Sequence, residues 1–578
     1  MASSKSHQYT CLSPGLLSPS SSSSLKSASD DVSRYASSYA LAQPYKHVQI
    51  LPLMTPQAAS GVRDEIISNL DASLRETDLF KVYQTPDLAN LDKDAASSAA
   101  PHLLALLEAI YSEEFRAFVS QVTNCGPLRG DKVDVSCNVY ANGGHLLCHD
   151  DVIGTRRVSF VIYLTDPDEA WEDEDGGALE LFPLDTLENN NETQQHPQPS
   201  CIPTKRVPPT YNSMVLFQVT PGVSFHAVQE VYAEDKPRLS VSGWFHAATP
   251  PPGYDTNATL AQLLEGKGAD ALAPLAPLTA DDNLVDLRGV VNDVYLKPET
   301  QKQVRDSFDA TGGSVELHDF LAPALANRVR AALKAADALD RLGGGRVPED
   351  NAGIRTGWEL QGPPHKRRFL EWCGGNGGGD DDDELGAVLG EVKRALASLA
   401  FGKLMSALTG DSLPSRARAT ARRFRAGLDY TVAHHGDLGA EDGEARLEAS
   451  LTFAGGGEDD DAHETWASGE VGGFTDYVKA TIDASSDKKK DDDGDEEQEV
   501  GPASKRRRKN DEESDKLAAA AEAAIYKDED DEDDVLCSHA SFNTITIVRR
   551  APNMLRFVKY LSAAAPGSLC DVFVEFDR

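Results

Sequence analysis

A succession of short apolar stretches between residues 133 and 246 limits the folds open to this chain more than any other feature. Stretches at 133–140, 157–165, 211–219 and 223–231 are strand-length, and Gly, Pro or Asn residues interrupt the chain between them. Apolar runs of this length bounded by turn residues indicate β-strands. Many short antiparallel strands, with helical patterns only before them, predict a jelly-roll barrel.

Two of these strand-like segments carry metal-ligand residue types. His149 and Asp151 are two positions apart, so on a strand their side chains share one face, and Asp150 points to the other. His226 opens a second alternating segment. Two histidines and one carboxylate can cap one face of an octahedron, as in non-haem iron(II) sites. A lone His-x-Asp or a lone buried histidine is usually structural, but their combination on successive strands predicts a metal site.

Arg238 follows His226 by twelve residues, in the strand-like run RLSVSGWF. A guanidinium beside such a metal suits a bidentate grip on a dicarboxylate co-substrate. Tyr163 either aims its hydroxyl into the barrel or is an ordinary core tyrosine. His145 shares the strand face of His149, and we expect a rim or core role for it rather than a fourth ligand.

Composition narrows the class of protein. The chain has 578 residues, enough for two to four domains, and a net charge of −37. That charge argues against direct nucleic-acid binding, although acidic runs at 380–384, 491–499 and 528–534 hold much of it. Eight cysteines without a C-x-x-C pair indicate a reducing compartment, and no apolar run has the length of a membrane span.

The flanking segments suggest where the folded parts begin. Residues 1–35 are Ser-rich and predict a disordered tail, with a transit peptide as the alternative. Apolar residues at helical spacing predict helices over 62–79, 101–122 and 323–342. The first two of these helices are expected to cover the outside of the sheet.

The second half repeats the order of features of the first, which predicts a duplicated barrel. Trp466 followed by Gly472-Gly473 mirrors Trp171 followed by Gly176-Gly177. Where the first half has its distal histidine and its arginine, the expected counterparts are Val558 and Cys570. His434 is followed two positions later by Gly436, although His435 and Asp437 restore a His-x-Asp by a shift of one. The set is incomplete, so this domain is predicted to be a barrel without iron that serves scaffolding, dimerisation or substrate docking.

A charged insertion at 485–534 contains five adjacent basic residues at 505–509. Such a run predicts nuclear import, with charge balancing inside a disordered loop as the alternative. The expected location is the nucleus and cytoplasm.

Several motifs together resemble a known family. They are FKVYQTPDLANL at 80–91, LLCHDD at 146–151, DGGALEL at 175–181, RLSVSGWFH at 238–246 and GPPHKRRF at 362–369. The chain resembles the 2-oxoglutarate- and iron(II)-dependent prolyl hydroxylases, in the two-barrel branch (prolyl 3- or 3,4-hydroxylases) that acts on a small-subunit ribosomal protein. The likeness extends from about residue 39 to the end and is broken by the acidic insertions.

The resemblance implies a fold class, α+β and mainly β, with two tandem double-stranded β-helix (jelly-roll) domains and flanking helices. The expected divisions are a tail at 1–35, a catalytic dioxygenase domain at 36–250, a linker with short helices at 251–311, and a non-catalytic domain at 312–578.

The resemblance also implies roles. Fe(II) would be held by His149, Asp151 and His226, and 2-oxoglutarate by Arg238 with Tyr163 and Ser240, with L-ascorbate as the reductant. The implied product is a hydroxylated proline in a small-subunit ribosomal protein, with an effect on translation. Translation termination factors are possible partners, and a homodimer is possible. The alternatives are an oxygen-sensing hydroxylase of another protein proline or lysine, and a non-catalytic adaptor for translation factors.

Overall fold

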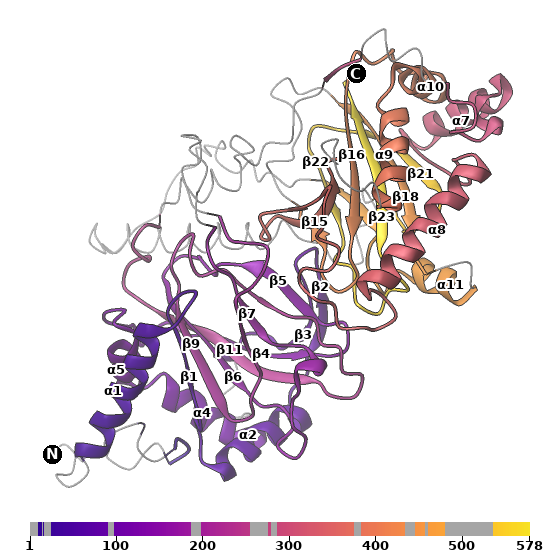
Figure 1. Cartoon of the computed structure of the whole chain (residues 1–578). Helices are drawn as coiled ribbons and strands as arrows, with labels where there is room; N and C mark the ends of the chain where they lie inside the picture. The colour runs from indigo at the N-terminus through magenta and orange to yellow at the C-terminus, as the bar shows by residue number, and fades with distance from the viewer. Residues whose placement is uncertain are drawn as a thin grey trace, which may run out of the picture. The chain divides into compact units, whose positions relative to one another are not determined.

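The computed structural model describes residues 10–13, 16, 25–90, 97–185, 198–254, 276–278, 286–374, 383–433, 445–456, 460–479 and 536–577. The described chain divides into two compact units. The first contains Met1–Pro183 and Thr204–Ala258, and the second contains Leu184–Pro203, Thr259–Lys479 and Glu532–Arg578 (Figure 1). The charged insertion at 485–534, including the basic run, lies outside the described residues. No helix in the described part of the chain is long and apolar enough to cross a membrane.

The first unit is a curled antiparallel sheet, here called the first barrel. Its strands follow the spatial order β1-β9-β6-β11-β4-β3-β5-β10-β7-β8, with β2 paired to β3. Their bounds are β1 (His47–Ile50), β2 (Ser73–Glu76), β3 (Phe80–Gln84), β4 (Asp134–Tyr140), β5 (His145–His149), β6 (Arg156–Tyr163), β7 (Leu179–Leu181), β8 (Lys205–Val207), β9 (Ser213–Gln218), β10 (His226–Val228) and β11 (Arg238–His246).

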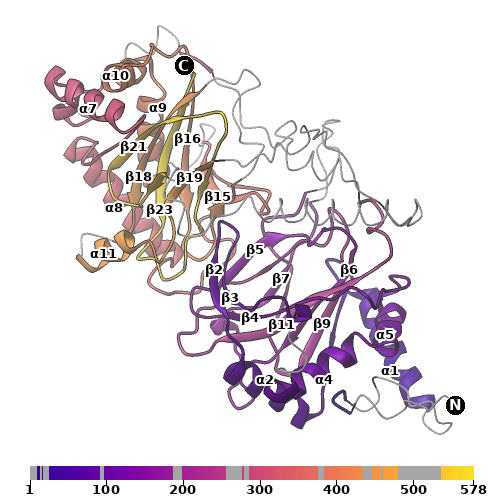
Figure 2. The same cartoon turned by 180° about the vertical axis from the view of Figure 1, so that it is seen from behind.

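Helices cover one face of this sheet (Figure 2). Along β6 the side chains of Phe160 and Ile162 join a core with the helices, whereas Tyr163 joins an apolar cluster with β7 and β9. This alternation follows from the two-residue period of a strand. The inner face therefore lies between the two halves of the curled sheet. The helices are α1 (Leu25–Leu41), α2 (Pro56–Asn69), α4 (Pro101–Ile110) and α5 (Glu113–Thr123).

Three sequence-based boundaries in this unit differ from the structure. The helix expected over 62–79 is α2, which ends at Asn69, and residues 73–76 form the exposed strand β2 instead. The helix expected over 101–122 is two helices, because the Ser112 hydroxyl accepts the Phe115 N–H and caps a new helix. The expected tail at 1–35 overlaps α1, and Leu12 and Leu16 are buried.

The second unit also contains a barrel of antiparallel strands, here called the second barrel. Its main sheet runs β13-β21-β18-β23-β16-β15-β14, and a smaller sheet runs β20-β19-β22. Further pairings join β12 to β16 and β17 to β15. The strands are β12 (Ala276–Pro277), β13 (Ser314–Leu317), β14 (Trp358–Gln361), β15 (Arg367–Trp372), β16 (Arg416–Phe424), β17 (Tyr430–Thr431), β18 (Arg446–Ala454), β19 (Thr475–Lys479), β20 (Leu536–Ser538), β21 (Thr544–Arg550), β22 (Met554–Val558) and β23 (Leu569–Phe576).

With β13 matched to β1 and β23 to β11, the run β13-β21-β18-β23-β16-β15 follows the order of β1-β9-β6-β11-β4-β3, and β20-β19-β22 follows that of β8-β7-β10. The expected fold class, two jelly-roll barrels with flanking helices, is confirmed. The sequence pattern had indicated this duplication through its order of Trp, Gly-Gly and strand segments.

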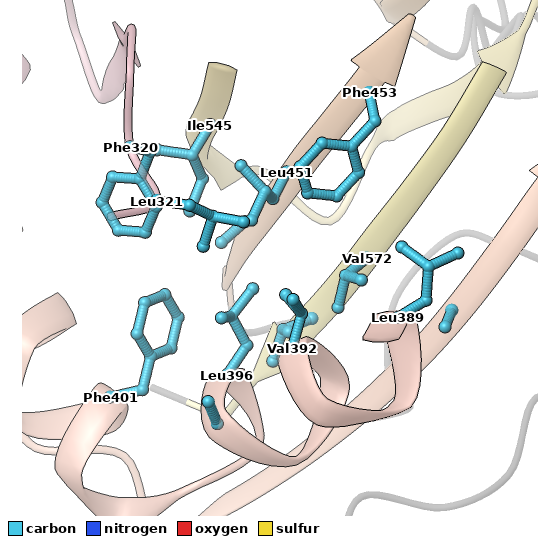
Figure 3. Packing of buried hydrophobic residues seen from close by; sticks show 14 of the residues in the cluster. Phe320, Leu321, Leu389, Val392, Leu396, Phe401, Leu451, Phe453, Ile545 and Val572 are labelled. Atoms are coloured by element: carbon cyan, nitrogen blue, oxygen red, sulfur yellow. The ribbon is translucent and has the colours of Figure 1, made fainter. Parts of the chain in front are cut away.

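The core of the second unit lies between its main sheet and its helices. Figure 3 shows Leu389, Val392 and Leu396 of one helix facing Leu451 and Val572 of the sheet. The helices are α7 (Pro298–Ala310), α8 (Pro323–Asp340), α9 (Glu384–Leu396), α10 (Leu399–Thr409) and α11 (Asp460–Ser468). Phe308 of α7 belongs to this core, so the second unit begins earlier than the expected boundary at 312.

Candidate metal centre and co-substrate site

The inner face of the first barrel brings three predicted ligands together. His226 of β10 pairs directly opposite His149 of β5. The Asp151 carboxylate lies between them, with Oδ1 3.4 Å from His149 Nε2 and Oδ2 3.4 Å from His226 Nε2. One potential ligand atom from each residue lies within 4.8 Å of the other two. No second group of this kind occurs in the part of the chain that the structure describes.

The position of Asp151 depends on its backbone. Strand β5 ends at His149, so the two-residue strand period does not extend to Asp151. Asp151 has a φ of 61°, in the left-handed region that Asp tolerates better than most residues. Its Oδ2 accepts a hydrogen bond from the Ser159 hydroxyl at 2.7 Å. Asp150, as expected, turns elsewhere, and its Oδ1 accepts the Val152 N–H.

Both imidazoles are oriented by backbone carbonyls. The Nδ1 atom of His149 lies 2.8 Å from the Leu147 carbonyl, and that of His226 lies 2.9 Å from the Ser224 carbonyl. An Nδ1–H that donates to a carbonyl leaves the Nε2 lone pair available to a metal. The two Nε2 atoms therefore face the same point as the carboxylate.

Electrostatics keep the carboxylate charged. Burial opposes ionisation of Asp151, but its interactions with the neighbouring imidazoles of His226 and His149 outweigh burial and hold its pKa well below the usual value. Burial likewise opposes protonation of His149, and its contacts with Asp151 prevail and raise its pKa. A low carboxyl pKa favours metal binding because the ligand must be deprotonated.

Arg238 lies on the inner face with unused hydrogen-bonding capacity. Its side chain is 1% exposed, its Nε donates to the Gly177 carbonyl at 2.7 Å, and its Nη1 donates to Ser240 Oγ at 3.4 Å. The guanidinium carbon lies 4.9 Å from the ring centroids of both Tyr140 and Tyr163. Arg238 Nη2 and the Tyr163 hydroxyl are buried and have no hydrogen-bond partner among the residues that the structure describes.

Such orphaned donors fit the carboxylate of a bound co-substrate. An unpaired buried guanidinium N–H costs free energy that a carboxylate oxygen would recover. Gly177 contributes more than its carbonyl, because a Cβ at that position would approach Arg238 Cδ to 3.0 Å. The residue types around the three ligands also suit iron(II), which accepts imidazole and carboxylate together.

Sequence reasoning missed two contributors and correctly set one residue aside. Ser159 holds the Asp151 carboxylate, and Tyr140 stacks beside Arg238. Their presence on inward strand positions was the only available signal. His145 is buried, with Nδ1 2.9 Å from the Gly143 carbonyl, and does not belong to the three-ligand group.

In the second barrel, strand register corrects one predicted match. The turn Gly472-Gly473 has positive φ values like those of Gly176-Gly177. Four residues beyond each turn, Leu181 pairs with His226 in the first barrel and Tyr477 pairs with Arg556 in the second. The counterpart of His226 is therefore Arg556, and the expectation of Val558 was wrong.

The expected match for Arg238 was also wrong, by one residue. A Cβ on Gly177 would meet Arg238 and Trp171, and a Cβ on Gly473 would meet Leu569 and Trp466. Leu569 thus takes the place of Arg238, rather than Cys570. The predicted His434 and His435-x-Asp437 lie outside the described residues, so the lack of iron in this barrel stays a prediction.

Comparisons with known proteins agree with this geometry. Residues 135–246 match the 2OG-Fe(II) oxygenase superfamily, and residues 282–578, just over half of the chain, match the family described as "Oxoglutarate and iron-dependent oxygenase degradation C-term".

Named relatives include the prolyl 3,4-dihydroxylase OGFOD1 of Ostreococcus tauri, 38% identical over 464 residues that cover 77% of this chain and 84% of the relative. The prolyl 3-hydroxylase OGFOD1 of Mus musculus is 32% identical over 64% of this chain and 56% of its own length. A solved prolyl-4-hydroxylase of Pseudomonas putida aligns over 37% of this chain and 98% of its own, with 20% identity and a TM-score of 0.25, too low to add to the assignment. The chain therefore belongs to the 2-oxoglutarate- and iron(II)-dependent oxygenases, in the OGFOD1 prolyl hydroxylase group.

Proposed function

We propose that the first barrel hydroxylates a prolyl residue of a protein substrate, with His149, Asp151 and His226 holding Fe(II) and Arg238 holding 2-oxoglutarate. The observation that carries the proposal is the meeting of the three-ligand group with the orphaned Arg238 Nη2 on one inner face. The prolyl substrate is supported by the two similar proteins of Ostreococcus tauri and Mus musculus, which are prolyl hydroxylases.

The metal and co-substrate supply oxidation, since Fe(II) with 2-oxoglutarate activates dioxygen for insertion into a C–H bond. The chain's own residues bind and orient the metal and the co-substrate. His149 and His226 present Nε2 lone pairs because their Nδ1 atoms lie against carbonyls. Ser159 fixes the Asp151 carboxylate, and Arg238 with Tyr163 fixes the distal carboxylate of the co-substrate. Ser240 holds the Arg238 guanidinium in place.

A small-subunit ribosomal protein remains the favoured substrate, with an effect on translation. Support comes from the motif resemblance and from charge, because a chain with a net charge of −37 complements a basic protein. Location in the nucleus and cytoplasm, ascorbate as reductant, and contact with translation termination factors belong to the same proposal.

The test is mass spectrometry of cellular ribosomal proteins with and without this enzyme, followed by reaction of the purified chain with the identified peptide. We expect a single proline to gain one oxygen or two, together with succinate formation from 2-oxoglutarate and Fe(II). A matched peptide with alanine at that proline is the control. An oxygen gained only on a non-ribosomal protein would favour the oxygen-sensing alternative, and partner binding without turnover on any peptide would favour the adaptor.

A further inference from the structure

The inner face of the second barrel carries a cluster of buried ion pairs. Strands β16, β18, β21 and β23 direct alanine, leucine, isoleucine and valine side chains toward the helices and alternate residues inward. Among the inward residues, Arg422 holds Asp571 and Arg550 holds Glu448. Arg418 and Arg446 share Glu575. Four arginines thus pair with three carboxylates.

Arg556 adds a fifth guanidinium to this face without a hydrogen-bonded carboxylate. Its side chain is 9% exposed. Its closest ion-pair contact is Nη2 to Asp571 Oδ2 at 4.0 Å, beyond hydrogen-bond reach. That carboxylate already accepts two hydrogen bonds from Arg422 Nε and Nη2. The guanidinium carbon of Arg556 lies 4.2 Å from the Phe573 ring centroid.

The unsatisfied atoms of Arg556 form one edge of its guanidinium. Nε and Nη2 are both buried and have no hydrogen-bond partner among the described residues. This is the edge with which Arg422 grips Asp571, and it matches a carboxylate bidentately. A buried guanidinium whose Nε and Nη2 have no hydrogen-bond partner is costly, and the arginines around it outnumber the carboxylates they pair with. A bound anion would therefore stabilise this site.

The first barrel shows the same signature where its co-substrate is expected. There the orphaned inward atoms are Arg238 Nη2 and the Tyr163 hydroxyl. In the second barrel Leu569 replaces Arg238, and Arg556 takes the place of His226. The second barrel therefore has its inward arginine at the position that a metal ligand occupies in the first barrel, and not at the position of Arg238.

We propose that the second barrel binds the carboxylate of a small organic acid on the Nε–Nη2 edge of Arg556, without a metal. A small acid fits better than a peptide because the side chain is almost wholly buried. Dicarboxylates of the 2-oxoglutarate and succinate class are the fitting ligands, because the family's reaction consumes one and releases the other. The competing account is structural, with Arg556 stacked on Phe573 and needing no ligand.

The experiment uses the full chain carrying Arg238→Met, which removes the co-substrate grip of the first barrel, after metal removal with a chelator. Its melting temperature is followed against succinate, 2-oxoglutarate, acetate and inorganic phosphate, each at the ionic strength of a sodium chloride control. We expect a saturable rise with the dicarboxylates. The double variant Arg238→Met/Arg556→Met should lose this rise, and Arg238→Met/Arg556→Lys should need at least tenfold more ligand, since lysine keeps the charge but lacks the fork.

Several outcomes would overturn the proposal. If no carboxylate raised the melting temperature of Arg238→Met, the proposal would be wrong, even if the Arg556→Met chain failed to fold. An equal rise with and without Arg556 would place the ligand elsewhere, and a response to phosphate alone would exclude a carboxylate. A lower melting temperature in the double variant with an unchanged succinate response would mean that Arg556 is only structural. None of these results bears on prolyl hydroxylation, which depends on the first barrel.

Discussion

His226 and His149 face each other across the pairing of β10 with β5, and the centroids of their rings are 4.2 Å apart. The two residues are far apart in sequence, yet both rings present Nε2 to the same carboxylate. A metal held between them would link strands β5 and β10. The site is thus created by strand pairing rather than by a local motif.

Replacing His226 by alanine should abolish bound iron and peptide-dependent succinate formation while the fold is kept. Two remaining ligands cannot complete the facial set. Metal analysis measures bound iron, a turnover assay measures succinate formation, and far-ultraviolet circular dichroism reports on the fold. His102→Ala, at an exposed histidine paired with Glu65, is the matched control and should behave like the wild type. Near-normal turnover by His226→Ala would remove His226 from the ligand set.

Arg238→Met should weaken 2-oxoglutarate binding by about 2 kcal/mol or more, roughly thirtyfold, because a buried charged partner of the co-substrate is lost. Tyr163→Phe removes one neutral hydrogen bond and should cost about 1 kcal/mol. Calorimetric titration of the metal-loaded protein gives both values, and iron affinity should change little. Arg206→Met, at a half-exposed arginine, is the control. Unchanged 2-oxoglutarate affinity in Arg238→Met would exclude this co-substrate role.

Ser159→Ala should lower metal affinity by about 10- to 100-fold without removing a ligand, the usual effect of losing an outer hydrogen bond to a metal-binding carboxylate. The hydroxyl holds Asp151 Oδ2 at 2.7 Å. Competition with a chelator of known affinity measures the change. Ser120→Ala removes a comparable hydrogen bond, to the carbonyl of Gly126 beyond the end of α5, and should leave metal affinity unaltered. Equal affinities in both variants would show that Ser159 does not position the carboxylate.

His246 should make the first unit sensitive to mild acid. Burial, reinforced by Lys132, Arg156 and Arg129, lowers the pKa of His246 to about 3 from its ordinary value of 6.5. Between these values the unfolded chain binds a proton that the folded chain does not. The contribution of neutral His246 to the free energy of unfolding is therefore complete above about pH 6.5. It is lost as the pH falls, by at most about 1.4 kcal/mol per pH unit.

This pH effect is measured by urea unfolding at pH 7, 6 and 5. His246→Asn removes the titrating group and should flatten the decline in unfolding free energy relative to the wild type. His102→Asn serves as the comparison, since that histidine is exposed. An identical pH dependence in wild type and His246→Asn would contradict the assignment.

Arg423→Leu should destabilise the second unit by about 3–5 kcal/mol, because it leaves the buried Asp337 carboxylate without its counter-charge, whereas Asp340 keeps its ion pair with Arg355. Arg423 is fully buried and pairs with Asp337 and Asp340 of α8. Denaturant unfolding, followed in the second unit, measures the loss. Lys302→Met, which breaks an exposed ion pair with Asp306, should cost less than about 0.5 kcal/mol. Similar losses in both variants would show that the buried network contributes little.

The residues of the candidate site could be predicted because chemistry restricts which side chains serve there. His149, Asp151, His226 and Arg238 stood on strand-like segments in the expected order, and the structure brings them to one face. The reason given for Asp151 was incomplete, since the residue lies beyond the strand with a positive φ. Ser159 and Tyr140 carried no motif, because polar and aromatic residues on inward strand positions are common.

The sequence by itself determined the barrel class, the duplication and the candidate metal ligands, because strand periodicity and ligand chemistry depend on residue type. Only the tertiary structure decided that Arg556 and Leu569, rather than Val558 and Cys570, stand at the matching places of the second barrel. Thirteen residues separate Arg556 from Leu569, whereas twelve separate His226 from Arg238. Register is set by which side chains of each strand face the core and by the turns between strands, so a loop longer by one residue makes a match based on fixed spacing fail.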